Sequence, residues 1–377
     1  MTAFDPIAFR RKLHAAPELS RHEHATSALV ADLLEGWGYE VARGVGGTGV
    51  VASLRNGAGE RAIGLRADMD ALPITEATGA AYASANPGVM HACGHDGHMT
   101  MLLTAAKQLA ETRDFSGTVR LIFQPAEEVG GAVEMIADGL FERFPVDAVF
   151  AMHNWPGIAA GDFRFTFGPT MASVDWIVIT IKGHGGHGAL PHEAVDPIVA
   201  ASSLVMALQT IVARSVDPME TAVVSVCMIH GGTQPNVIPD TVELQLTTRA
   251  FTDKVRDTIR ERIKVLAETH AAAYGATADV KHPPGFPALI NPEAETAFAQ
   301  QVAIRHFGEE HVATVPPRMV SEDFAFMLEK KAGAYLFIGN GPSAELHSPR
   351  YDFNDAIIAR GAAYWVALAK DYLAANR

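Results

Sequence analysis

The chain has 377 residues, of which 48% are hydrophobic, with 30 Lys and Arg against 43 Asp and Glu. This length exceeds the size at which one hydrophobic core stops growing, so a large domain plus a smaller one is expected. The net charge of −13 is spread along the chain without a basic run. That pattern excludes the electrostatic footprint of a nucleic-acid or anionic-membrane protein, and a small-molecule substrate is the expected partner.

The sequence lacks a secretory signal, a membrane-spanning run and a disulfide framework. Residues 1–13 carry charges but are not followed by the apolar stretch of a secretory signal, and no apolar run is long enough to span a bilayer. A cytoplasmic protein without membrane contact is therefore expected. Only Cys93 and Cys227 occur, in unrelated contexts, which argues against a disulfide framework. Cys227 lies in the apolar run 223–229 and is predicted to be buried.

In the first part of the chain, short apolar runs alternate with helical stretches. Ser20-Arg-His-Glu23 has the pattern of a capping box, followed by a helix that Gly38 ends. Strands are predicted at residues 50–54, 62–67, 118–123 and 146–152, and a helix is predicted at 99–109. Continuously apolar strands alternating with helices indicate an α/β fold with a mostly parallel sheet and flanking helices.

The pattern changes near Ser173, where strands acquire one polar face. Strands are predicted at 174–182, 221–230, 241–249 and 277–281, and helices at 197–214 and 252–270. This β-α-β-β-α-β order is typical of a ferredoxin-like α+β unit. We therefore expect residues 173–284 to form an inserted domain between two parts of the first domain, 1–172 and 285–377. The last part should supply a strand at 334–338 and a final helix ending near Leu373.

The densest group of potential metal ligands is His91-Ala-Cys93-Gly-His95-Asp96-Gly-His98, which is predicted to lie in a loop punctuated by glycine. Thiolate and imidazole donors two residues apart can reach one metal ion. This donor set favours zinc, with manganese, cobalt and nickel as alternatives. A hydrogen-bonded turn rich in histidine is the other interpretation of the same spacing.

Acidic and imidazole groups also follow two of the predicted strands. Gln124-Pro-Ala-Glu127-Glu128 comes directly after the strand 118–123, at the edge where open α/β sheets place their ligands. One of these acids could bind a metal while its neighbour acts as a general base, although both could instead complement a helix dipole. His153 follows the strand 146–152 in the same way, and a packed, hydrogen-bonded histidine is its alternative role.

Asp68 and Asp70 add a pair of carboxylates after the strand 62–67. Asp70 could orient a ligand imidazole from behind the metal, whereas surface turn residues are the alternative. Donor side chains now follow several successive strands. One shared metal site explains them more economically than a separate structural role for each.

Five motifs in one order carry a resemblance to a known family. They are Gly64-Leu-Arg-Ala-Asp-Met-Asp-Ala-Leu-Pro73, His91-Ala-Cys-Gly-His-Asp-Gly-His98, Gln124-Pro-Ala-Glu-Glu128, Met152-His-Asn154 and Ser321-Glu-Asp-Phe324. Over nearly its whole length the chain resembles the amidohydrolase branch of the aminoacylase and carboxypeptidase G superfamily of dinuclear metallopeptidases. This is the branch of hippurate hydrolase and the plant auxin-conjugate hydrolases. The resemblance implies a zinc-exopeptidase-like catalytic domain with an inserted, dimer-forming ferredoxin-like domain.

Carried over by motif position, the resemblance implies two divalent metal ions per subunit, either Zn, Mn, Co or Ni. The implied ligands are Cys93, His95, Glu128, His153 and His347. Glu127 would be the general base, and Asp70 the carboxylate behind the metal site. The peptidase branches have His-x-Asp where this chain has Asp68-Met69-Asp70, and they lack a counterpart of Cys93. Both departures favour the amidohydrolase branch.

Three residues of the inserted domain also match family positions. His187 would reach the site of the partner subunit and help to stabilise the oxyanion. Asn236 and Arg249 would hold the substrate, with Arg249 binding its carboxylate. The residues alone would suggest other roles. They would indicate a flexible glycine-rich hinge around His187 and a solvated strand end at Arg249.

The expected activity is hydrolysis of the amide bond of N-acylated amino acids, of the hippurate or N-acetyl amino acid type, to a carboxylic acid and a free amino acid. The resemblance implies attack by a metal-bridging water that is assisted by Glu127. A homodimer or higher homo-oligomer is expected. The alternatives are a dipeptidase or carboxypeptidase on the same scaffold and, with less support, a non-catalytic metal- or ligand-binding protein. Neither the acyl group nor the amino acid follows from the sequence.

Overall fold

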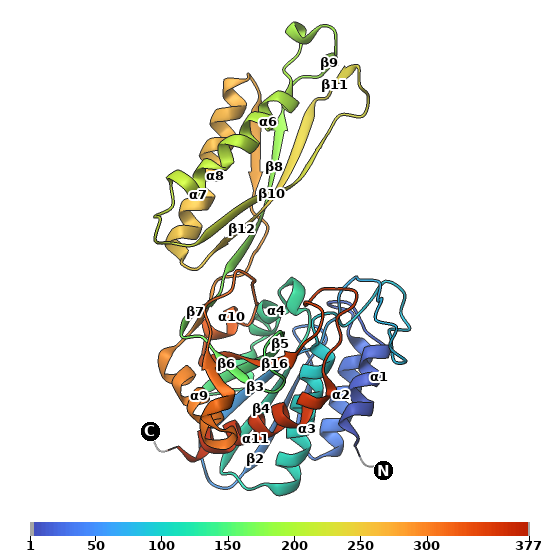
Figure 1. Cartoon of the computed structure of the whole chain (residues 1–377), viewed down its shortest axis with the longest axis vertical. Helices are drawn as coiled ribbons and strands as arrows, with labels where there is room; N and C mark the ends of the chain where they lie inside the picture. The colour runs from blue at the N-terminus through green and yellow to red at the C-terminus, as the bar shows by residue number, and fades with distance from the viewer. Residues whose placement is uncertain (1–3, 376–377) are drawn as a thin grey trace. The chain divides into compact units, whose positions relative to one another are not determined.

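The computed structural model describes residues 4–375, so the first three residues of the charged segment 1–13 and the last two of the chain lie outside the described residues. The chain forms two compact units. The first contains the residues up to Thr170, Ile290–Pro316 and the residues from Asp323 onward, and the second contains Met171–Leu289 and Pro317–Glu322. In Figure 1 the first unit combines the part of the chain coloured from blue to green, up to Thr170, with orange-to-red parts near the C-terminus.

The first unit is built on an eight-stranded sheet. In spatial order its strands are β1 (Glu40–Val45), β2 (Gly49–Asn56), β4 (Gly117–Gln124), β3 (Ala62–Asp68), β5 (Ala148–Pro156), β16 (Ala332–Gly341), β6 (Phe163–Phe165) and β15 (Val312–Thr314). The four central strands run parallel to one another, whereas β1 and β2 form an antiparallel edge. The prediction of a mostly parallel sheet is confirmed.

Helices flank this sheet. The longer ones are α1 (Pro6–Ala15), α2 (His24–Gly36), α3 (His95–Thr112), α9 (Glu293–Phe307) and α11 (Ile358–Ala374). The short helical segments are η1 (Glu127–Val129), α4 (Gly131–Ala137), α5 (Leu140–Arg143), η3 (Glu309–His311), α10 (Ala325–Leu328) and η4 (Asp355–Ile357). A small sheet pairs β7 (Gly168–Met171) with β14 (Leu289–Asn291).

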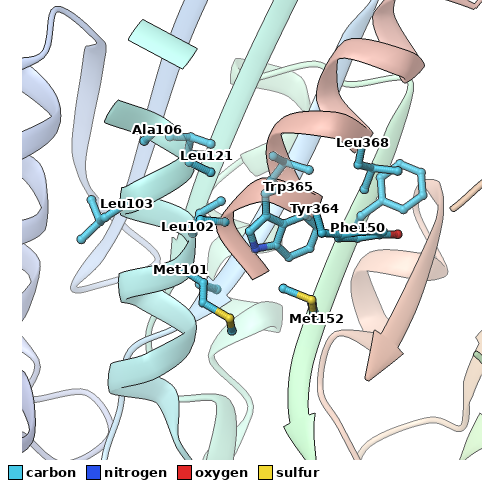
Figure 2. Close-up of a cluster of buried hydrophobic side chains, with 14 of the residues drawn as sticks. Met101, Leu102, Leu103, Ala106, Leu121, Phe150, Met152, Tyr364, Trp365 and Leu368 are labelled. Carbon is cyan, nitrogen blue, oxygen red and sulfur yellow. The ribbon is translucent and has the colours of Figure 1, made fainter. Parts of the chain in front are cut away.

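The core of the first unit lies between the central strands and the helices α3 and α11. Figure 2 shows Leu102 of α3, Trp365 and Leu368 of α11, and Phe150 and Met152 of β5 gathered in one cluster. All five side chains are at most 3% exposed. Burying residues of this size contributes roughly 1.5–3 kcal/mol each, so this contact fixes the helices on the sheet and, with them, the edge that bears the polar motifs.

The capping-box prediction at Ser20–Glu23 is wrong, although the helix after it is present. Glu23 is the N-cap of α2, but its side chain makes no capping hydrogen bond. The hydroxyl of Ser20 instead donates to Asp70, and the carboxylate of Glu23 accepts from the backbone N–H of Ala126. Both side chains therefore form hydrogen bonds with residues distant in the chain, and neither caps the N-terminus of α2.

The second unit has the element order that the sequence predicts. Its sheet has the strand order β10 (Ala222–Gly231), β12 (Thr241–Ala250), β8 (Ser173–Lys182) and β13 (Thr277–Lys281), with every pair antiparallel. The helices are α6 (Pro197–Leu208), α7 (Thr210–Arg214) and α8 (Asp253–Ala273), with η2 (Pro191–Glu193) before them. This is the order of a ferredoxin-like sheet.

Cys227 is exposed, so the prediction that it is buried is wrong. The pairing register of β10 with β12 shifts between Val226 and Met228, which leaves Cys227 as the extra residue of a bulge on an edge strand. None of the helices described between residues 4 and 375 combines the length and the apolar character needed to span a bilayer.

Candidate metal centre

The polar motifs of the first unit meet at the carboxyl ends of the parallel strands. Pairing of β3 with β4 aligns Asp68 with Gln124 at the last residue of each strand. His153 lies near the end of the neighbouring strand β5. His95 begins α3, so the prediction that it lies in a loop is corrected: the loop ends at Gly94.

Cys93, His95 and His153 form a buried triad of potential ligands. Their ligand atoms all lie within 4.8 Å of one another, and the Sγ of Cys93 is 3.4 Å from the Nε2 of His153. Gly94 permits this approach, because its backbone is left-handed at φ 90° and an added Cβ would lie 2.3 Å from the amide nitrogen of Asn154. The sequence therefore needs glycine between the thiol and the first imidazole.

Hydrogen bonds fix the orientation of both imidazoles. The Nδ1 of His95 donates to the carbonyl oxygen of Asp70 at 2.8 Å, and the Nδ1 of His153 donates to the carbonyl oxygen of Asn154 at 2.6 Å. In each ring Nδ1 donates its proton away from the triad, so Nε2 is the nitrogen that faces the triad. The buried Nε2 of His95 has no hydrogen-bond partner among residues 4–375. A buried, oriented ring nitrogen without a protein partner is the arrangement that a metal ligand requires.

The electrostatics of the triad favour a cation. Burial by itself would lower the pKa of His95, but the carboxylates of Asp68 and Asp70 more than offset it and raise this pKa to about 10. The same negative potential attracts a divalent ion, which would replace the proton on Nε2. Burial holds the pKa of His153 well below its usual value, and the neighbouring His98 lowers it further. His153 is therefore neutral, the form that binds metal.

His98, from the same motif, has a structural role. Its Nδ1 donates to Asp68 at 2.6 Å, and its Nε2 accepts the backbone N–H of Asn154 at 3.0 Å. The side-chain amide of Asn154 in turn donates to the carbonyl of Cys93, and its oxygen accepts from the hydroxyl of Tyr351. Both nitrogens of His98 are thus committed, although its ligand atoms also lie close to those of His95 and Asp68. His98 therefore stabilises the residues around the triad through hydrogen bonds.

Glu127 and Glu128 lie in the turn η1, which follows β4. The carboxylate of Asp70 accepts the backbone N–H of Glu127 at 3.1 Å and that of Glu128 at 3.2 Å. The same side chain lies 3.2 Å from the Nδ1 of His95. Asp70 therefore links the turn to the triad, as expected for a carboxylate behind a metal site.

Glu128 and His347 complete a second potential ligand group, which shares Cys93 with the first. The ligand atoms of these three residues lie within 4.8 Å of one another, and the Nε2 of His347 is 3.3 Å from an oxygen of Glu128. His347 has a left-handed backbone at φ 63°, and its N–H donates to the carbonyl of Ala92. The structure thus brings all five candidate ligands into two overlapping groups. Glu127 lies beside them, with its carboxylate 4.0 Å from the Nε2 of His95.

The other three candidate residues belong to the second unit. His187 lies on β9 (Gly186–His187), which pairs with β11 (Val237–Ile238), and the carbonyl of Asn236 accepts the N–H of Gly188. His187 and Asn236 are therefore neighbours, and both are exposed. Arg249 lies on β12, where its guanidinium donates to the hydroxyl of Thr247 and the carbonyl of Thr248.

A buried charge network beside the triad was not anticipated from the sequence. Asp96 accepts a hydrogen bond from Arg10 at 3.3 Å and lies 2.8 Å from the Nδ1 of His14, and all three side chains are fully buried. Arg10 also donates to Asp355 near the start of α11. The helical spacing of Arg10 and His14 on α1 was a possible signal, but nothing near them indicates a partner at position 96.

Comparison with known proteins agrees with this geometry. Residues 64–371 match the model of peptidase family M20/M25/M40. The chain is 44% identical over 366 residues to a hippurate hydrolase of Campylobacter jejuni, covering 97% of this chain and 95% of the relative. It is 42% identical over 372 residues to an N-acetyl-L-cysteine deacetylase of Bacillus subtilis, covering 98% and 88%.

A solved structure from Bacillus subtilis, described as a dinuclear metal binding peptidase from the M20 family, is similar over 98% of this chain and 97% of its own. The TM-score is 0.85 at 35% sequence identity. The matches extend through both units and are not confined to the motifs. The chain therefore belongs to peptidase family M20/M25/M40, within its amidohydrolase branch, and is a hydrolase of amide bonds.

Proposed function

We propose that the chain is a metal-dependent amidohydrolase that cleaves N-acylated amino acids of the hippurate or N-acetyl amino acid type. The observation that carries this proposal is the buried triad of Cys93, His95 and His153, whose imidazoles direct their Nε2 atoms toward one another's ligand atoms beside the carboxylate of Glu127. The relatives named as a hippurate hydrolase and an N-acetyl-L-cysteine deacetylase support this substrate class.

The proposed ligands of two divalent ions are Cys93, His95, Glu128, His153 and His347. Bound ions would supply Lewis acidity toward a carbonyl oxygen and toward water. The thiolate and imidazole donors favour zinc, with manganese, cobalt and nickel as alternatives. The dinuclear metal binding peptidase among the similar structures supports a pair of ions.

Glu127 is the proposed general base. Its side chain is 7% exposed, and the turn that carries it is held by Asp70. In this role its carboxylate accepts a proton from the attacking water and returns it to the nitrogen of the departing amino acid. The net result is one amide bond exchanged for a carboxylic acid and a free amine. Such proton transfers contribute about 100- to 10,000-fold to a rate.

We further propose that residues 173–284 act as a dimer-forming domain that contributes to substrate binding. Arg249 would bind the substrate carboxylate, Asn236 would hold the amide, and His187 would stabilise the oxyanion in the partner subunit. The strand β10 supports an interface on this unit, because it lies at the edge of its sheet and exposes the adjacent apolar side chains of Met228 and Ile229, and an exposed apolar edge strand favours pairing with another chain.

A substrate panel tests the proposed function. Steady-state hydrolysis of hippurate, N-acetyl amino acids and unblocked dipeptides would be measured with chelated enzyme and with enzyme reconstituted with zinc, manganese or cobalt. We expect metal-restored cleavage of the acylated amino acids only. Preference for unblocked dipeptides would instead assign a dipeptidase. If the enzyme bound two ions but hydrolysed none of these substrates, the proposal would be contradicted.

A further inference from the structure

Three consecutive backbone N–H groups at the start of the catalytic turn are held by two buried carboxylates. Asp70 accepts those of Glu127 and Glu128, and Glu23 accepts that of Ala126 at 2.8 Å. Asp70 also contacts His95, so its link to the metal site is direct. Glu23 contacts none of the candidate ligands, and its hydrogen bond to the catalytic turn is the one that it accepts from Ala126.

The carboxylate of Glu23 is fully buried and has a donor on each oxygen. One oxygen accepts the N–H groups of Arg21 and Ala126, and the other accepts the hydroxyl of Thr48 at 2.6 Å. Burial raises the pKa of this carboxyl group, and the hydrogen bond from Thr48 opposes that effect. A buried acid without a cation beside it is costly, so its retention here calls for a specific task.

That task is visible in the backbone that Glu23 holds. Ala126 is left-handed, with φ 54° and ψ 38°, a conformation that residues other than glycine, asparagine and aspartate rarely adopt. Arg21, bonded to the same carboxylate oxygen, is also left-handed at φ 67°. The bend at Ala126 turns the chain from β4 into η1 and so sets the direction in which Glu127 leaves the sheet. Strained backbone of this kind persists only where its surroundings hold it.

We propose that Glu23 is a positioning residue for Glu127: it fixes the left-handed bend at Ala126 and so aims the general base. The proposal rests on the proposed function of Glu127. The role requires an acceptor oxygen at the position of the Glu23 carboxylate and does not require its charge. Glutamine can meet this requirement, because its carbonyl oxygen can accept from Arg21 and Ala126 while its amide donates to the hydroxyl of Thr48.

The test compares Glu23→Ala and Glu23→Gln with a matched control, Leu34→Ala, in the metal-loaded full chain. Leu34 is a fully buried residue of α2, the helix that Glu23 precedes, so the control destabilises the same segment without touching the bend. Three quantities would be measured: kcat and KM, the metal content by elemental analysis, and amide hydrogen exchange of the peptide spanning residues 124–131.

For Glu23→Ala we expect two ions retained, KM changed by less than about twofold, and kcat lowered about 10- to 100-fold, the size of effect known for small displacements of catalytic groups. Amide exchange of 124–131 should be faster than in the wild-type chain. Glu23→Gln should restore kcat and slow exchange. Leu34→Ala should lower the melting temperature but leave kcat and the exchange of this peptide unchanged.

Unchanged kcat and unchanged exchange in Glu23→Ala would overturn the proposal. So would a loss in Glu23→Gln as large as that in Glu23→Ala, because the charge would then be what matters, or an equal loss of kcat in Leu34→Ala. A wild-type chain without metal-dependent hydrolysis would refute the proposed function instead. The exchange measurement would then still decide whether Glu23 holds the bend.

Discussion

The Sγ of Cys93 lies 3.4 Å from the Nε2 of His153, with the imidazole proton held on the far side of the ring by the carbonyl of Asn154. Alkylation of Cys93 would place bulk in the position proposed for a metal ion. We therefore expect thiol-selective alkylation of the metal-free enzyme to block metal uptake and activity, and bound metal to protect against it.

Cys227 is exposed and will also be alkylated, so the experiment needs a Cys227→Ser background. Metal content by elemental analysis and labelling by mass spectrometry would be read together. Full reconstitution of a chain alkylated at Cys93 would show that this thiol is not a ligand.

His98 and His95 should respond differently to substitution. His98→Ala leaves one oxygen of Asp68 and the N–H of Asn154 without their partners, so we expect it to lower the free energy of unfolding by about 2–4 kcal/mol while two ions remain bound. His95→Ala should lose metal. Denaturant unfolding and elemental analysis of both variants check this, and equal metal loss in the two would identify His98 as a ligand.

Glu127→Gln keeps the shape of the side chain and removes its basicity. We expect metal content to stay normal and kcat to fall about 100- to 10,000-fold, because only proton transfer is lost. Glu128→Gln is the matched control, since the adjacent acid is a proposed ligand and its substitution should weaken metal binding. Near-normal turnover in Glu127→Gln would remove this residue from the mechanism.

His14 should make stability depend on pH. Burial lowers its pKa, but the carboxylates of Asp96 and Glu76 outweigh burial, and the pKa in the folded chain is raised above 6.5. A raised pKa stabilises the folded state below pH 6.5, and this contribution disappears as the pH rises through the folded-state value.

The destabilisation caused by His14→Gln should therefore be larger at pH 6 than at pH 9. Unfolding free energies of the metal-loaded wild-type and variant chains at both pH values would be compared. A difference independent of pH would mean that folding does not raise the pKa of His14, and a larger difference at pH 9 would mean that His14 is held neutral in the folded chain.

The main polar motifs could be placed from the sequence because their position depends on local rules. A buried apolar run predicts a strand, and parallel strands end at one edge, so Asp70, Glu127 and His153 were expected to meet. The structure brings them together in that way. The order of strands and helices in the second unit followed from the same periodicity.

The contacts that were missed depend on residues distant in the chain. Ser20 and Glu23 fit a local capping pattern, yet their partners lie at Asp70 and Ala126, and no helical or strand periodicity encodes those pairs. Cys227 looked buried because its neighbours are apolar, but it lies on the edge strand β10, where residues 227–231 are all exposed. Long-range pairing decides which strand lies at the edge of a sheet, and this leaves no mark in local composition.

The position of β16 in the sheet constrains the order in which the first unit can fold during synthesis. This strand lies between β5 and β6 in the sheet, although it follows both of them in the chain by more than the length of the second unit. A nascent chain therefore carries Cys93, His95, Glu128 and His153 well before β16 and His347 are synthesised. Completion of the first unit requires long-range pairing, which is slow, so metal loading should be one of the last events in the biogenesis of the enzyme.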